Sequence, residues 1–142
     1  MNKNKQELHW QPISFLPQIR EMIDGMLESA EENLLNFTGI EDRLPVFDDY
    51  TVGRMFEVYG NQKRDFWLYD DQLQRWQCTR LNDLQEKEIK RLQVQMVKLK
   101  NVVDKLLNIA EQLKDNTIET VLGKDDFELA MEVLTGKRKM PL

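Results

Sequence analysis

The sequence IKRLQVQMVKLKNVVDKLLNIAEQL, residues 89–113, carries an apolar residue at every third or fourth position. Those positions are Ile89, Leu92, Met96, Leu99, Val103, Leu106, Ala110 and Leu113. Heptad spacing of this kind places them along one side of a single α-helix, where they form a seam. Because a seam in water would expose too much apolar surface, we expect other helices, from this chain or from a second copy, to cover it.

The composition fits one soluble, helix-rich domain that spans residues 1–142. The chain is 41% hydrophobic and 32% charged, and its net charge of −5 gives no general attraction to nucleic acid or to anionic membranes. Its polar first residues and its lack of a long apolar run predict neither secretion nor a membrane span. The single cysteine, Cys78, cannot form an intramolecular disulfide, which favours a cytoplasmic location.

Two more helices are expected before the seam. An N-terminal arm, residues 1–15, leads to a first helix that begins near Leu16 and ends near Gly39. After a connection over residues 40–48, a second helix covers about residues 49–78, with an aspartate at its N-terminus. The seam of this second helix is mostly aromatic and comprises Val52, Met55, Tyr59, Gln62, Phe66, Tyr69, Leu73 and Trp76.

The two longest helices are separated by a turn of three residues, 79–81, and are therefore predicted to be antiparallel neighbours. Asn82 and Gln85 match a capping box at the start of the third helix, which we expect over about residues 82–115. Later start and stop signals predict two short helices and a tail, Thr117–Leu122, Asp126–Thr135 and 136–142. The predicted fold is an all-α antiparallel helical bundle.

The third helix is apolar beyond its seam, because Val102, Leu107 and Ile109 occupy flanking positions that carry charges in a two-stranded coiled coil. We therefore expect at least two helices to pack against it. Residues 18–37 hold five carboxylates and one arginine, net −4, whereas residues 89–105 hold five bases and one carboxylate, net +4. This complementarity predicts that the first helix packs beside the third.

Polar and small residues in the second helix also carry expectations. Gly53 and Gly60 lie inside it, where glycine costs about 1 kcal/mol relative to alanine. Such glycines suggest that a neighbouring backbone or a large ring approaches closely. The hydroxyls of Tyr59 and Tyr69 and the indole N–H groups need partners when they are buried. Gln62 in the same seam either supplies one of these partners or marks a slightly hydrated position.

No constellation of catalytic or metal-binding residues is recognisable in the sequence. His9 is the only histidine, and Cys78 has no histidine near it in sequence to act as a base. A di-iron bundle, which needs two Glu-x-x-His motifs, and a thiolate zinc site both require more ligands than the chain has. We therefore predict no catalytic residue, no cofactor and no metal.

The closest approach to a metal site is a set of carboxylates on the first two helices, Glu28, Glu31, Glu32, Asp70 and Asp71. Helical nucleotide pyrophosphohydrolases of the MazG type hold magnesium with a Glu-Glu-x-x-Glu motif and a later Glu-x-x-Asp motif. Glu31 and Glu32 are followed by Leu35 instead of a third glutamate, and the second motif is absent from the second helix. The resemblance fails on both motifs, so solvated acidic surfaces are the simpler interpretation. A magnesium-dependent nucleotide hydrolase is the alternative.

A comparison with basic-zipper transcription factors also fails. Residues 82–91, directly before the leucines, hold three acidic and three basic side chains, whereas a DNA-reading helix needs a strong positive excess there. The terminal Lys137–Lys139 cluster and the basic part of the third helix leave one further alternative, an accessory protein of a nucleic-acid-processing system. Nucleic acid is not the partner that we expect.

The leading hypothesis is a non-catalytic cytoplasmic protein that acts through protein–protein interaction or self-association. The third helix is much longer than the first, so part of its seam would lie uncovered and favour a homodimer; another protein is the second expected partner. The expected assembly residues are Ile89, Leu92, Met96, Leu99, Val103, Leu106, Leu113, Tyr59, Phe66, Tyr69 and Trp76. The aromatic face of the second helix is either a ligand or peptide groove or, more simply, core, and it comprises Phe56, Tyr59, Phe66, Trp67, Tyr69 and Trp76.

Overall fold

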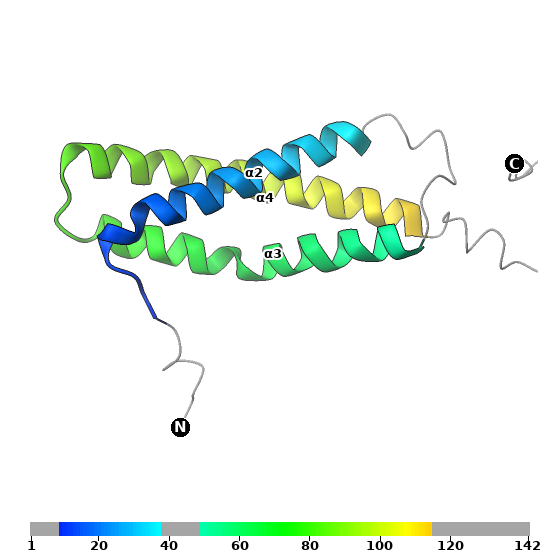
Figure 1. Ribbon diagram of the computed structural model, residues 1–142, viewed down its shortest axis with the longest axis horizontal. Coiled ribbons are helices and arrows are strands. Elements are labelled where there is room, and N and C mark those ends of the chain that lie inside the picture. Colours follow the sequence, from blue (N-terminus) through cyan, green and yellow to red (C-terminus); the bar gives the residue numbers. More distant parts are fainter. Residues whose placement is uncertain (1–8, 38–48, 115–142) are drawn as a thin grey trace, which may run out of the picture.

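A computed structural model describes residues 9–37 and 49–114. Within these ranges the regular structure is helical, with a 3-10 turn η1 (Ile13–Phe15) and the helices α2 (Leu16–Phe37), α3 (Asp49–Gln77) and α4 (Asp83–Leu113). Figure 1 shows α2 and α4 running in one direction and α3 in the other, which confirms the all-α antiparallel bundle. The two short helices expected after α4 lie outside the described residues. None of the described helices has the length and apolar character that crossing a bilayer requires.

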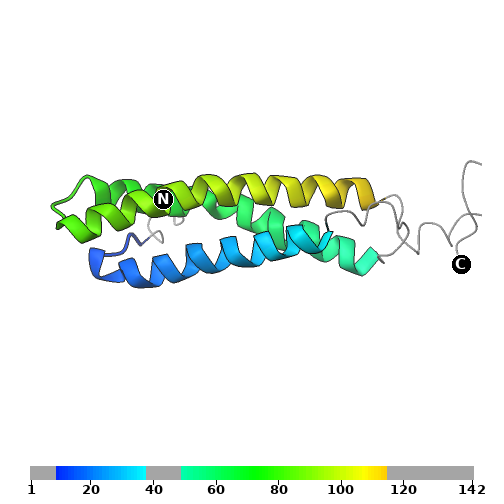
Figure 2. The same ribbon diagram turned by 90° about the horizontal axis from the view of Figure 1, so that it is seen from above.

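The central helix is α4, which packs against both α3 and α2, while α2 and α3 make few close backbone contacts with each other. Figure 2 shows α2 and α4 lying along one another. Every seam residue from Ile89 to Leu113 is at most 1% exposed within the single chain. The expectation of at least two neighbours is confirmed, and the uncovered stretch of seam that favoured a homodimer does not occur between these residues.

Local hydrogen bonds build the turn between α3 and α4. The backbone N–H of Thr79 donates to the carbonyl of Trp76 at 2.9 Å, just beyond the end of α3. The capping box is confirmed, because the Asn82 side chain accepts from the Gln85 N–H at 2.8 Å and the Gln85 side chain accepts from the Asn82 N–H at 3.0 Å. This short, capped turn makes α3 and α4 the antiparallel neighbours that the sequence predicts.

Arg91 confirms the predicted pairing of the acidic first helix with the basic third helix. Its guanidinium donates to Asp24 on α2 at 3.1 and 2.8 Å and to Glu88 on α4 at 3.0 and 2.8 Å. The hydrogen bonds from Arg91, with a weaker one from Gln95, lower the pKa of Asp24 against the opposing effect of burial. Asp24 and Arg91 are each more than one-third exposed, so their pair contributes under about 1 kcal/mol and chiefly selects the position of α2.

The prediction for the glycines of α3 is wrong. A Cβ built at Gly53 or Gly60 meets no neighbouring heavy atom within 4 Å, because both positions face open space rather than a backbone or a ring. The buried Tyr59 hydroxyl takes its partner from another helix, since the side-chain amide of Asn33 on α2 donates to it. Gln62 does not serve Tyr59, and its own side-chain oxygen is buried without a hydrogen-bond partner among the described residues.

Candidate functional site

The residues predicted as the assembly seam lie in the interior of the bundle. On α3, Tyr59, Phe66 and Trp76 are at most 5% exposed. Tyr69 is partly buried, and this burial is the main reason why its pKa is raised. The aromatic stripe of α3 is therefore mainly core. Trp67 is its exposed member, with 47% of its surface accessible.

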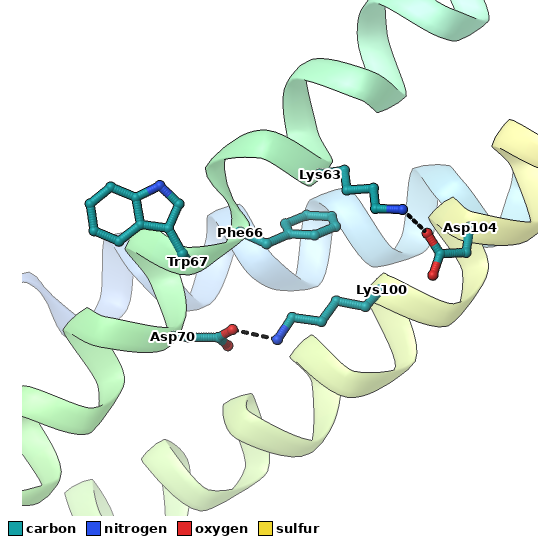
Figure 3. A pocket seen from close by; sticks show the side chains of 6 residues that line it. All are labelled: Lys63, Phe66, Trp67, Asp70, Lys100 and Asp104. Carbon is teal, nitrogen blue, oxygen red and sulfur yellow. Dashed lines mark hydrogen bonds and ion pairs between the residues drawn. The ribbon is translucent and has the colours of Figure 1, made fainter.

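A pocket of about 280 Å³ opens between α3 and α4, with α2 behind it (Figure 3). This pocket is termed here the α3–α4 groove. It is lined by Lys63, Phe66, Trp67, Asp70, Lys100 and Asp104. Lys63 Nζ lies 2.8 Å from Asp104 Oδ1, and Lys100 forms a second ion pair with Asp70 in the opposite direction across the groove. The ring of Phe66 lies between the two ion pairs and forms the floor of the groove.

The spacing of the sequence explains how these side chains meet. Lys63 and Asp70 stand one heptad apart and so lie on the same side of α3. In an antiparallel hairpin, the residue nearer the end of α3 faces the residue nearer the start of α4, which brings Asp70 to Lys100. The four charged side chains are 39–58% exposed, so each ion pair contributes under about 1 kcal/mol and fixes the register more than the stability.

The N-terminal arm leans against the rim of the groove. Figure 3 shows the indole of Trp67 pointing away from Phe66. The ring of Trp10 meets Trp67 edge to face, with ring centroids 6.4 Å apart and ring planes at 76°. The guanidinium carbon of Arg75 lies 4.2 Å from the centroid of the Trp10 ring, within cation–π distance. One aromatic side chain of the arm is thus held by two residues of α3.

The backbone of the arm is bound as well. The Gln72 side chain, which is 5% exposed, accepts a hydrogen bond from the Gln11 N–H at 2.7 Å and directs its amide nitrogen to the Gln11 carbonyl at 3.4 Å. The indole N–H of Trp76 donates to the same carbonyl at 2.8 Å. Both polar groups of the Gln11 backbone are therefore satisfied by α3. This contact was not predicted from the sequence. The one feature that indicates it is the indole N–H of Trp76, which needs an acceptor when it is buried.

The other side chains considered for chemistry do not gather into a site. The remaining carboxylates of the acidic set are exposed on two helices, namely Glu28, Glu31, Glu32 and Asp71. His9 in the arm and Cys78 in the turn are also exposed. Within residues 9–37 and 49–114, no group of three or more histidine, cysteine or carboxylate side chains is placed to hold a metal ion.

Neighbouring carboxylates neutralise much of the basic stretch of α4. The ion pairs are Lys90 with Glu86, Arg91 with Asp24 and Glu88, and Lys100 with Asp70. The terminal cluster Lys137–Lys139 lies outside the described residues. The described surface thus combines an aromatic, ion-paired groove with a docked arm. Comparison with known proteins supplies no family for it, since no family model, no curated protein and no solved structure matches the chain.

Proposed function

We propose that this chain is a non-catalytic helical-bundle protein of the cytoplasm that acts by binding another protein, or a second copy of itself, at the α3–α4 groove. The observation that carries the proposal is the half-exposed Trp67 at the rim of the groove. Tryptophan contributes more binding energy than most residues when a partner buries it, and such residues work within a ring of polar contacts. The polar side chains around Trp67 are those of Lys63, Asp70, Lys100 and Asp104.

The bundle suits this role because the groove lies on two helices held by a buried seam. Phe66 is only 3% exposed, so the floor of the groove is fixed by the core rather than by a loop. The side chains of the two ion pairs are exposed enough to form ion pairs with charged groups of a partner, which would favour specific binding and fast association. Association at this outer surface would leave the seam covered and the core closed.

A photo-crosslinking amino acid at position 67 tests the proposal in cells of the natural host. Met22 on α2 is the matched control position, because its side chain is apolar and 45% exposed against 47% for Trp67. We expect one protein, or a second copy of the chain, to be linked covalently at position 67 and not at position 22. Equal products at both positions would contradict the proposal.

Reconstitution with the purified partner then measures how much Trp67 contributes to the free energy of binding. Trp67→Ala should weaken the complex by about 30-fold, as expected for a residue worth about 2 kcal/mol at an interface, while Met22→Ala should leave it unchanged. If the partner is a second copy, sedimentation should show a dimer that only Trp67→Ala weakens. A Trp67→Ala complex of undiminished affinity would place the interface elsewhere.

A further inference from the structure

The contacts of the arm have the chemistry of a peptide bound to a receptor. The chain is extended at Pro12, with φ −69° and ψ 162°, and the residue before it gives both of its backbone polar groups to side chains of α3. One neighbouring side chain, Trp10, supplies the sequence-dependent contact. In peptide-recognition sites, main-chain hydrogen bonds likewise provide affinity and side-chain contacts provide specificity.

The receptor side of this contact does not depend on which residue it holds. Gln72 and Trp76 bond only the N–H and C=O of Gln11, and every residue other than proline has both groups. Gln72 is the buried polar residue of the described core, and both of its side-chain groups are directed at the arm. A different extended segment would satisfy these side chains equally well.

The arm also fills its surface incompletely. A hollow of about 670 Å³ lies beside it, bordered by the arm at Gln11 and Pro12 and by the turn at Cys78, Thr79 and Arg80. The hollow is open to solvent, so a segment with larger side chains could fill it and bury apolar surface that the arm leaves exposed. The arm is therefore an imperfect occupant, and a ligand with larger side chains after the bound residue has room to gain.

We propose that Trp67, Gln72, Arg75 and Trp76, termed the arm site, bind an extended segment of another protein that carries an aromatic residue directly before the residue whose backbone is held. The arm occupies this site in cis, at an effective concentration in the millimolar range because it is tethered. A partner segment must displace it. The arm site shares Trp67 with the α3–α4 groove, but the inference goes beyond the proposed function because it concerns a second surface and a stated ligand.

A peptide titration of the full-length chain tests the inference. The probe is the fluorescein-labelled, C-terminally amidated peptide His-Trp-Gln-Pro-Ile, the sequence of residues 9–13, followed by fluorescence anisotropy. Trp10→Ala removes the side chain that holds the arm, so this variant should bind the probe at least about 10-fold more tightly than the wild type, whose own arm competes. Gln11→Pro, which removes the N–H that Gln72 accepts, should release the arm independently and give the same gain.

Two controls identify the site. A probe with alanine in place of tryptophan should bind neither variant, and Gln72→Leu added to Trp10→Ala should abolish binding while circular dichroism shows the helices intact. Probe binding that survives Gln72→Leu, or no saturable binding to either released variant up to about millimolar peptide, would overturn the inference. A wild-type dimer formed by exchange of arms would also overturn it, because the occupant would then be a second copy. A failed titration leaves the crosslinking test at position 67 standing. Because Trp67 belongs to both surfaces, Gln72→Leu separates the two proposals: it should leave crosslinking by a partner of the α3–α4 groove unchanged and abolish crosslinking by a segment bound at the arm site.

Discussion

Replacing Leu99 by alanine should destabilise the bundle severely, because this side chain is 0% exposed and lies midway along the seam of α4. Truncating a buried leucine removes its contacts and leaves a cavity, at a cost of about 2–5 kcal/mol. Helices α2 and α3 both press against α4, which limits how far the site can collapse, so we expect a loss of about 4 kcal/mol. Domains of this size are stable by about 5–15 kcal/mol, so the variant should remain folded in the absence of denaturant.

Urea unfolding followed by circular dichroism measures this loss. The control is Leu84→Ala on the same helix, whose side chain is 79% exposed and whose truncation should change the free energy of unfolding by less than about 0.5 kcal/mol. With a slope of about 2 kcal/mol/M, a loss of 4 kcal/mol lowers the urea midpoint by about 2 M. A Leu99→Ala midpoint within about 0.5 M of the Leu84→Ala midpoint would refute the burial argument. A difference between the two variants that changes with protein concentration would show that the seam is shared between copies.

Three further predictions concern local features of the helices. Gly53→Ala and Gly60→Ala should each raise the free energy of unfolding by about 0.5–1 kcal/mol, because a Cβ meets no neighbour at either position; a lowered thermal midpoint would contradict this. Asn82→Ala should cost about 0.5–2 kcal/mol in urea unfolding through loss of the capping box, and no loss would mean that the cap is not formed in solution. The lowered pKa of Asp24 stabilises the fold above the carboxyl's unfolded pKa, near 4, and this contribution disappears as the pH falls through the lower folded pKa. Asp24→Asn should therefore reduce stability at pH 7 by under about 1 kcal/mol, and this loss should shrink as the pH falls below the unfolded pKa; a loss that does not change with pH would exclude the linkage.

The seam and the start of α4 could be predicted from the sequence because they depend on local rules. A heptad repeat defines one side of a helix whatever surrounds it, and Asn82 with Gln85 forms a cap within four residues. Opposite net charges predicted that α2 packs beside α4, and among the ion pairs of the described residues one joins these two helices. Arg91 and Asp24 then supply the contact itself.

The arm and the groove could not be predicted in the same way. Gln11 and Gln72 are 61 residues apart and lack any pattern that pairs them, since their contact depends on where the end of α3 meets the start of α2. The exposure of Trp67 depends on its position one residue past the seam at Phe66, which a list of aromatic residues does not distinguish. The glycine prediction failed because it assumed a tertiary reason for residues that face open space.

The way α2 and α3 both pack on α4, with few close backbone contacts between them, has a consequence for the order of folding. The hairpin of α3 and α4 joins residues close in sequence through a short turn, so its formation closes only a small loop, whereas docking of α2 closes a much larger one. We expect the hairpin to form in the transition state and α2 to add afterwards. Core truncations in α2, such as Ile23→Val, should then accelerate unfolding in stopped-flow experiments, whereas Leu73→Ala in the hairpin should slow refolding.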